Sequence, residues 1–261
     1  MTIKELIDNQ KVGWSLHQRF YTDPDIYEAE LDHIITKNWI MIGHVSEFSD
    51  TGDFKVFNMA NESAIIVRSP DGNLKAFANV CRHRGSLVCL EQSGTIRKFS
   101  CPYHGWVYDL NGNLIQVRDM PDDFDKKDYG LHGLSLDIVH GLVFICFSGN
   151  PPSLESAKKE LKGPMSDFDF ENMKVAASKM YPIEANWKLS IENYQECYHC
   201  ATAHPEYAKM HTMMLDREKR ERMQNHMYEN MIACGLRDLE IEKTNINAPS
   251  GEQGYEYSRT A

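Results

Sequence analysis

Hydrophobic and polar positions follow different patterns in different parts of the chain. Between Asp25 and Trp39 apolar residues recur near helical spacing, and Pro24 stands where a helix would begin. Beyond residue 40 the apolar runs become short and rich in β-branched and aromatic residues, with turn residues at 70–72 and 111–112. The pattern therefore predicts a helix over 25–39, followed by an antiparallel β domain to about residue 150 with strands at 64–68, 75–79 and 141–147.

The pattern changes again after Pro151-Pro-Ser, which marks a boundary. A short helix is expected at 154–161 and a strand at 174–183, before a stretch from Asn186 with few helix breakers. Residues 210–236 are mostly helix-forming, and the charge run at 216–222 is interpreted as a solvated helix face. The sequence thus predicts a second region that combines helices and strands.

Composition limits the classes of function. The chain has 261 residues, of which 42% are apolar, so it can bury a substantial core in two domains. A formal net charge of −10 argues against a nucleic-acid partner. Charged residues near the N-terminus and the lack of a long apolar run predict neither a signal peptide nor a membrane span. The seven irregularly spaced cysteines indicate a reducing compartment, so we expect a cytoplasmic protein.

Four residues in two short segments form the most specific pattern. Cys81-Arg-His83 and Cys101-Pro-Tyr-His104 are separated by seventeen residues, and each segment supplies one thiolate and one imidazole. Thiolates bind zinc and iron–sulfur clusters, and neutral imidazoles lower the negative charge around a metal. The quartet therefore predicts either an electron-carrying iron–sulfur centre or a structural zinc site.

The spacing favours the iron–sulfur centre. Zinc fingers and ribbons commonly place two sulfurs in one Cys-x2-4-Cys turn. In a Rieske [2Fe-2S] centre one iron takes two thiolates and the other takes two imidazoles, so each loop contributes one of each. We therefore expect a Rieske cluster with four protein ligands, namely Cys81, His83, Cys101 and His104, and structural zinc is the alternative.

The two segments resemble a known family. Cys-Arg-His-Arg-Gly at 81–85 and Cys-Pro-Tyr-His-Gly-Trp at 101–106 are similar to the Rieske domain of ring-hydroxylating and N-demethylating non-haem iron oxygenases. Cytochrome bc-type Rieske proteins differ, because they join the two loops by a disulfide, and nothing in 101–106 could pair with Cys89. The resemblance implies an α+β protein made of a helical segment at 1–39, an antiparallel β Rieske domain at 40–152 and the N-terminal part of a helix-grip-like catalytic domain at 153–261.

A second motif lies in the stretch from Asn186 to Pro205. On a helix that turns about 100° per residue, Glu192, Glu196 and His199 share one stripe. His204 would point about 140° away from His199. If both histidines bind one ion, the helix must end or widen first, and Pro205 favours an ending. We therefore predict irregular backbone at 200–204.

Taken alone, His199 and His204 fit the description of ordinary polar residues near a helix end. In a chain with a one-electron carrier, however, iron bound by two histidines and a carboxylate is the usual electron acceptor. The pattern Asn193-x-x-Glu196-x-x-His199-x4-His204 also resembles the catalytic iron motif of the same oxygenases. The resemblance implies that His199 and His204 bind a mononuclear non-haem Fe(II).

The resemblance also implies catalytic roles for Glu196 and Asn193. In these enzymes a carboxylate at the position of Glu196 forms hydrogen bonds to two histidines. One is an iron-ligating histidine, here His199, and the other is His104 of the partner subunit. Such a carboxylate fixes both imidazole tautomers and completes a route for electrons. Asn193 would assist near the iron by hydrogen bonding. Most of the family has Asp at the position of Glu196, and Glu-Cys-Tyr-His-Cys at 196–200 is similar to the branch that acts on carnitine and glycine betaine.

Other residues of this stretch have structural interpretations. Cys197 and Cys200 are expected to pack as small side chains, and Glu192 to stabilise the helix surface. Three tyrosines have the chemistry to surround a cationic nitrogen, although core packing is the expected role: Tyr194, Tyr198 and Tyr207.

The expected function is that of a terminal oxygenase, an enzyme of the EC 1.14 class. By the resemblance, NAD(P)H would supply electrons through a flavin and iron–sulfur reductase or a ferredoxin, and O2 would hydroxylate a small organic substrate. The reaction would be N-demethylation or C–N cleavage of a quaternary ammonium compound, or aromatic ring hydroxylation. The protein is expected to be a homo-oligomer, by family likeness a trimer. The alternatives are a Rieske electron-transfer protein and a catalytically incomplete oxygenase fragment.

The third iron ligand has no candidate motif. The family supplies an Asp well downstream, whereas this sequence stops at Ala261, so we expect a C-terminally truncated chain with a complete Rieske site and an incomplete catalytic site. Three carboxylates are available and no pattern selects one: Asp216, Asp238 and Glu242.

Overall fold

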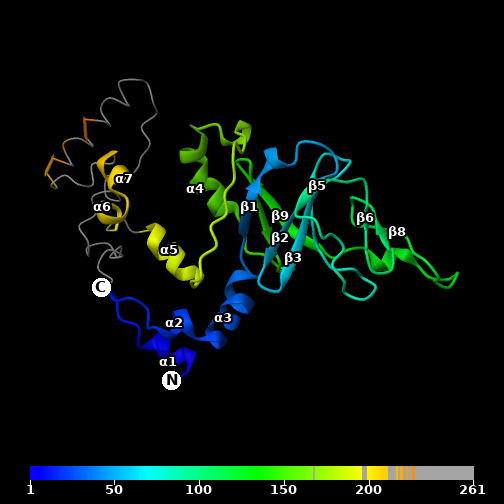
Figure 1. The fold of residues 1–261 in the computed structure, drawn as a ribbon, viewed down its shortest axis with the longest axis horizontal. Coiled ribbons are helices and arrows are strands. Elements are labelled where there is room, and N and C mark those ends of the chain that lie inside the picture. Colours follow the sequence, from blue (N-terminus) through cyan, green and yellow to red (C-terminus); the bar gives the residue numbers. More distant parts are fainter. Residues whose placement is uncertain are drawn as a thin grey trace. The chain divides into compact units, whose positions relative to one another are not determined.

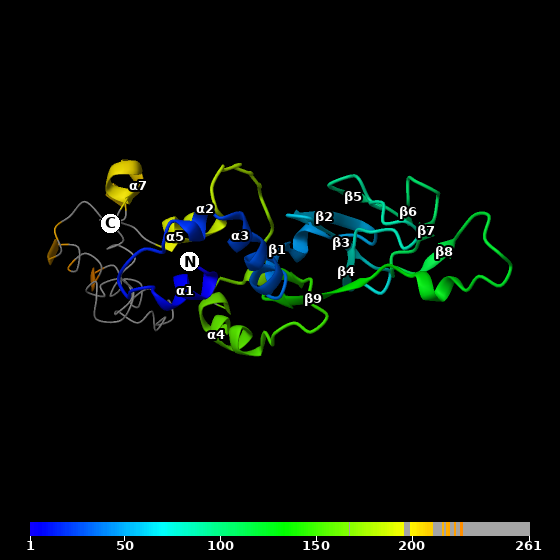
Figure 2. The ribbon, with the colours of Figure 1, turned by 90° about the horizontal axis from the view of Figure 1, so that it is seen from below.

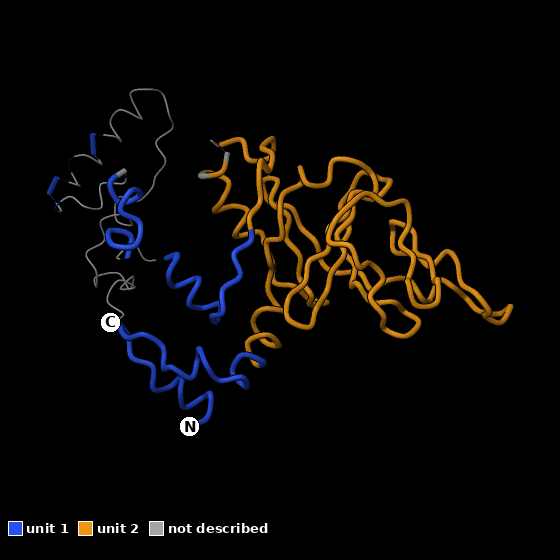
Figure 3. Tube along the Cα trace, viewed as in Figure 1, with its two compact units in different colours: residues 1–28, 180–261 blue, residues 29–179 orange. Residues whose placement is uncertain are grey.

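The chain divides into two compact units in the computed structural model, which describes residues 1–166, 168–195, 199–210, 216, 218, 219, 222, 225 and 226. One unit, the β unit, is Ala29–Lys179 (Figure 3). The other, the helical unit, consists of Met1–Glu28 and Met180–Ala261. The first 28 residues therefore belong to the same unit as the second motif.

Ten antiparallel strands build the β unit. The larger sheet has the order β1-β10-β9-β4-β3-β2-β5, and the smaller has the order β6-β7-β8 (Figures 1 and 2). The strands are β1 (Ile40–His44), β2 (Asp53–Met59), β3 (Glu62–Arg68), β4 (Leu74–Ala78), β5 (Ser93–Thr95), β6 (Phe99–Ser100), β7 (Val107–Tyr108), β8 (Leu114–Gln116), β9 (Gly133–Val139) and β10 (Leu142–Cys146). The strands predicted at 64–68, 75–79 and 141–147 are confirmed as β3, β4 and β10. The two predicted turns are also present, closed by Gly72 N–H to Ser69 O and Gly112 N–H to Asp109 O.

Strand β3 is buried on both faces. Ile65 and Val67 lie in one hydrophobic core, and Ala64 and Ile66 lie in the other. Successive side chains of a strand point to opposite faces, so a continuous apolar run suits a central strand with a core on each side. Each fully buried Ile or Val contributes about 1.5–3 kcal/mol.

The core on the Ile65 side joins the two sheets. It packs Phe54 and Phe77 of the larger sheet with Phe99 and Tyr108 of the smaller one, and it also contains Cys81, Cys101 and Trp106. The predicted cluster ligands thus lie where the two sheets meet.

Asn79 fixes the chain after the first ligand loop. Its side chain is 1% exposed, its Oδ1 accepts from Val88 N and Cys89 N at 3.0 and 2.8 Å, and its Nδ2 donates to Cys89 O at 2.8 Å and Ser63 Oγ at 3.1 Å. A buried amide with all these bonds made stabilises one loop conformation, because any loss leaves a buried polar group unpaired.

Helices lie on either side of the β strands in sequence. The helix predicted at 25–39 is present but shorter, as α3 (Pro24–Glu30) continued by a π-helical turn at Leu31–Ile35. The helix predicted at 154–161 is confirmed as α4 (Glu155–Ser166), which extends five residues farther. The helical unit contains α1 (Ile3–Asp8), α2 (Arg19–Thr22), α5 (Trp187–Gln195), α6 (Cys200–Ala203) and α7 (Pro205–Met210). No described helix combines the length and the hydrophobicity that a membrane span needs.

The strand predicted at 174–183 is wrong, because the described backbone there belongs to no helix or strand. Its side chains are exposed, Met180 at 90% and Tyr181 at 69%. An apolar sequence forms a strand only when a neighbouring strand pairs with it, and no described strand pairs with this segment. Most of the predicted helix at 210–236, and the strand-like residues after 255, lie outside the described residues.

Candidate metal centres

The two loops that carry the quartet have the same backbone design. Cys81 N–H donates to Ser86 O and Cys101 N–H donates to Trp106 O, both at 2.8 Å and both across five residues. Gly85 N–H donates to Cys81 O at 2.9 Å, and Gly105 N–H donates to Cys101 O at 3.0 Å. Each loop thus closes on itself around its cysteine.

Gly85 and Gly105 are required by backbone conformation. Their φ angles are +73° and +70°, in the left-handed region that side chains rarely adopt. A Cβ on Gly85 would meet no atom within 4 Å, so available space does not explain the glycine. The glycine that follows each ligand pair in sequence is therefore part of the loop geometry.

The two thiols are buried and close to one another. Cys81 and Cys101 are 3% and 2% exposed, and neither forms a disulfide. Burial raises the pKa of Cys81, the hydrogen bond from Tyr108 opposes that rise, and interaction with Cys101 adds to it. Two buried thiols so close together are suited to a shared positive centre.

Tyr108 joins this pair through its hydroxyl. Its Oη lies 3.3 Å from Cys81 Sγ and accepts from Arg82 N at 3.1 Å. When Cys81 is a thiolate its sulfur can only accept, so the phenol then donates its proton to the sulfur. Burial, followed by the bond to Cys81, raises the pKa of Tyr108, so the phenol stays a donor at neutral pH.

The two imidazoles form a second pair. The ring centroids of His83 and His104 are 4.5 Å apart at an interplanar angle of 72°. His83 Nδ1 is buried and has no hydrogen-bond partner. Buried ring nitrogens are normally bonded, so this atom has the property of a metal ligand.

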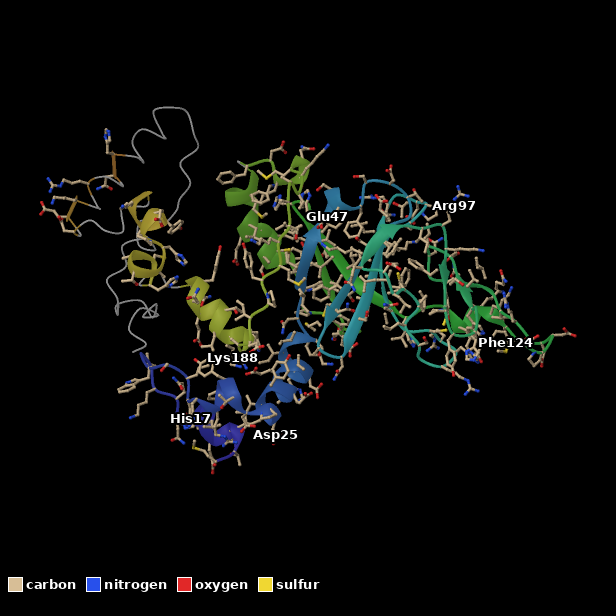
Figure 4. The ribbon with its side chains drawn as sticks, in the orientation of Figure 1. His17, Asp25, Glu47, Arg97, Phe124 and Lys188 are labelled. Carbon is tan, nitrogen blue, oxygen red and sulfur yellow. The ribbon has the colours of Figure 1, made fainter. Side chains whose placement is uncertain are left out.

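The environments of the two imidazoles differ. His83 stacks on the indole of Trp106, with centroids 4.8 Å apart at 8°, and Trp106 is itself 2% exposed. The rings of Phe124 and Tyr129 also contact the Trp106 indole, both in edge-to-face arrangements (Phe124 is labelled in Figure 4). His104 is exposed, and the ring of Tyr103 lies 3.8 Å from it. Both imidazoles border a 660 Å³ cavity that Arg118 also lines.

The donor set fits a two-iron cluster. A structural zinc would need four ligands around one point. A Rieske cluster needs only two per iron, and here the thiols pair with each other and the imidazoles pair with each other.

Tyr108→Phe is expected to lower the reduction potential of the cluster. A hydrogen bond donated to a ligand sulfur stabilises the reduced cluster, because the reduced cluster is more negative. The change removes this donor and therefore disfavours reduction. A loss of about 1–1.5 kcal/mol corresponds to roughly 40–65 mV for a one-electron couple. Spectroelectrochemical titration measures it. Tyr129→Phe is the control, since Tyr129 touches Trp106 and has no bond to a thiol; equal potentials in both variants would contradict the role of Tyr108.

The second motif places two histidines beside one cavity. The ring centroids of His199 and His204 are 5.4 Å apart at 78°, and both rings line a cavity of 610 Å³ in the helical unit. Asn193 of α5 lines the same cavity. Glu196 and Cys197 lie outside the described residues.

The backbone near these histidines is broken, although less widely than predicted. Residues 200–203 form the single helical turn α6, and the departure from helix falls on His204, with φ −133° and ψ 63°. α7 then starts at Pro205. Because a proline disfavours helical backbone at the residue before it, the sequence itself explains this break.

Two features of the cavity have no signal in the sequence pattern. Glu206 lines it together with Tyr194 and Tyr207, and none of the described residues that line it is a lysine or an arginine. Asp216, one of the carboxylates considered as a third ligand, instead pairs with Lys219 at 2.9 Å. Asp238 and Glu242 lie outside the described residues. Cys200 is buried, in agreement with its expected packing role.

Comparison with known proteins gives matches to both regions. The Rieske [2Fe-2S] domain family matches residues 38–131, and the ring-hydroxylating alpha subunit catalytic domain family matches residues 170–258. The chain is 37% identical over 206 residues to the glycine betaine monooxygenase oxygenase subunit of Pseudomonas aeruginosa, covering 78% of this chain and 48% of that protein. It is 32% identical over 192 residues to the chlorobenzene dioxygenase subunit alpha of a Cupriavidus species, covering 70% of this chain and 43% of that one.

A solved structure has the same fold. The crystal structure of a quaternary ammonium Rieske monooxygenase in complex with L-carnitine aligns with a TM-score of 0.70 at 32% identity, over 80% of this chain and 60% of that one. The chain spans about half the length of the curated relatives it matches.

Proposed function

The chain belongs to the Rieske ring-hydroxylating oxygenase alpha subunits, and from this premise we propose that it acts as the terminal oxygenase component of a multicomponent oxygenase. The observation that carries the proposal is the presence, in one chain, of a paired thiol and imidazole site and of a second histidine pair beside a cavity. A Rieske electron carrier would need only the first of these.

We assign the cluster to Cys81, His83, Cys101 and His104, and the mononuclear iron to His199 and His204. When bound, the cluster supplies one-electron transfers and the iron supplies the site of O2 activation. The residues around them have distinct tasks: Tyr108 donates to a ligand sulfur, Trp106 shields His83, and His104 is left exposed toward a redox partner.

Glu196 has the expected role of bridge between His199 and His104 of the partner subunit, and Asn193 that of a hydrogen-bonding residue near the iron. The position of Asn193 on the cavity lining supports the second role. A bridge between subunits requires a homo-oligomer, which by family likeness is a trimer. NAD(P)H would supply electrons through a separate reductase or ferredoxin, and the free state of the five described cysteines supports a cytoplasmic location.

The preferred substrate class is a quaternary ammonium compound. The relatives whose names include glycine betaine and L-carnitine support this choice, as does a cavity whose described lining includes the phenols of Tyr194 and Tyr207 and the carboxylate of Glu206. Aromatic faces and carboxylates attract cations. Aromatic ring hydroxylation is the second candidate, and the likeness to a chlorobenzene dioxygenase subunit supports it.

Turnover with the two substrate classes tests the proposal. With glycine betaine or carnitine, a compatible reductase and NADH, we expect one O2 and one NADH to be consumed for each C–N bond cleaved, with an aldehyde, an amine and water as products. With chlorobenzene, labelled O2 would instead appear in a diol or phenol. Reduction of the cluster without substrate-dependent O2 uptake in either case would contradict the proposal and favour one of the two alternatives, a Rieske electron-transfer protein or a catalytically incomplete oxygenase fragment.

A further inference from the structure

The N-terminal segment lies against the helix that leads into the second metal centre. Residues 1–28 group with residue 180 onward in the helical unit. Within that unit α2 lies beside α5 in both ribbon views (Figures 1 and 2). The contact joins parts of the chain that are far apart in sequence, so it has to be explained by specific side chains.

Tyr21 of α2 makes that contact through both of its ends. Its Oη donates to the Glu192 carboxylate, with oxygens at 2.8 and 3.1 Å, and its carbonyl oxygen accepts from Asn186 Nδ2 at 3.3 Å. Asn186 and Glu192 are six residues apart, about 9 Å along a helix. One tyrosine therefore binds α5 through Glu192 and also binds Asn186, the residue directly before the helix.

A buried cation completes the contact. Lys188 of α5 is 9% exposed, and its Nζ lies 5.9 Å from the Tyr21 ring centroid and 5.2 Å from that of Trp187 (Lys188 is labelled in Figure 4). Cation–π attraction strengthens when the cation is removed from water. Burial, followed by the bond to Glu192, raises the pKa of Tyr21 to about 12, so its hydroxyl remains a donor over the physiological range.

The occupied carboxylate belongs to the residue next to Asn193. Asn193 lines the cavity with His199 and His204, whereas Glu192 does not line it. Glu192 therefore attaches α5 to Tyr21, and the next residue of α5, Asn193, lines the cavity of the proposed iron site. A shift or rotation of α5 would move Asn193 relative to both histidines.

We propose that Tyr21 is a positioning residue for the mononuclear iron site, and that the N-terminal segment acts through the Tyr21–Glu192 bond to hold α5 in the orientation that presents Asn193 to the cavity. This inference rests on the proposed function, because it takes His199 and His204 to bind iron. It predicts that a change of one hydroxyl group in the N-terminal segment alters the second metal centre and leaves the first unchanged.

Tyr21→Phe tests the proposal, because it keeps the ring beside Lys188 and removes only the donor. Replacing residues that support metal ligands commonly weakens metal affinity by 10–100-fold, and Tyr21 acts one step farther out, so we expect Fe(II) affinity to fall roughly three- to tenfold. The electron paramagnetic resonance spectrum of the ferrous site with nitric oxide should shift as well. The visible spectrum and potential of the Rieske cluster should stay unchanged.

Conservative variants separate positioning from general destabilisation. Glu192→Gln keeps an acceptor oxygen and should retain wild-type iron affinity, whereas Glu192→Leu should match Tyr21→Phe. The double variant Tyr21→Phe with Glu192→Leu should lose no more Fe(II) affinity than either single variant, as expected when both changes remove the same interaction. Tyr27→Phe, at a 37% exposed tyrosine of the same segment, is the matched control and should behave as wild type.

If Tyr21→Phe changes neither the Fe(II) affinity nor the spectrum of the ferrous site, the positioning role of Tyr21 is overturned and the proposed function still stands. A wild-type chain that binds no Fe(II) outside the Rieske cluster would favour a catalytically incomplete fragment over the proposed oxygenase, and would overturn this role together with the proposed function. The two failures are therefore distinguishable in one set of titrations.

Discussion

Cys101→Ser is expected to abolish the Rieske cluster, with loss of its visible absorption and of both its irons and both its sulfides. A serine hydroxyl at neutral pH is protonated and is a harder, weaker ligand for iron than a thiolate. Cys101 is 2% exposed in the core between the two sheets, so no external ligand can replace it easily. Because metal binding contributes to folding, the thermal midpoint should fall too.

Cys89→Ser is the matched control for this change. Cys89 is 7% exposed in the same core, and its Sγ donates to Glu91 O at 3.6 Å, a bond that a hydroxyl can also make. The cluster should therefore persist in this variant. Equal cluster loss in the two variants, or a wild-type chain that carries zinc and no acid-labile sulfide, would contradict the assignment of Cys101.

His204→Ala is expected to lower oxygenation by roughly a thousandfold or more while leaving the cluster intact. Removal of one of two histidine ligands weakens the iron site, and a catalytic metal commonly supplies several kcal/mol of transition-state stabilisation. Iron analysis should show loss of the mononuclear iron only. The cluster ligands lie in the other compact unit, so their spectrum provides an internal standard.

Thr202→Ala serves as the control beside this site. Thr202 Oγ1 donates to His199 O at 3.0 Å, but the side chain does not line the cavity. The variant should keep its iron and most of its turnover. Full iron retention in His204→Ala would remove His204 from the ligand set and favour a different residue of the cavity, with Glu206 the first to examine.

The cluster site could be proposed from the sequence because its determinants are local. Each ligand loop closes its own backbone hydrogen bonds within six residues, so the spacing of Cys81 to His83 and Cys101 to His104 carries most of its geometry. The strands of the β unit were predictable for a similar reason, since apolar runs and turn residues alternate along the chain. The order of the strands was not, because it depends on pairing between distant segments.

Contacts between distant residues account for what the sequence could not predict. Tyr21 and Glu192 are 171 positions apart, and Tyr108 reaches back 27 positions to Cys81. No spacing rule links such pairs. The segment at 174–183 was wrongly predicted as a strand for the same reason. Its composition suits a strand, but a strand also needs a neighbouring strand to pair with, and the local sequence does not show whether one is present.

The matched hydrogen bonds of the two ligand loops also bear on how the cluster enters the protein. Each loop is constrained by its own amide groups and by a glycine of positive φ, so much of its backbone shape comes from bonds within the protein. Little conformational entropy then has to be lost at the moment of insertion. Transfer of a preassembled cluster, or its rebuilding from iron and sulfide after mild oxidation, should therefore proceed without refolding of the surrounding sheets.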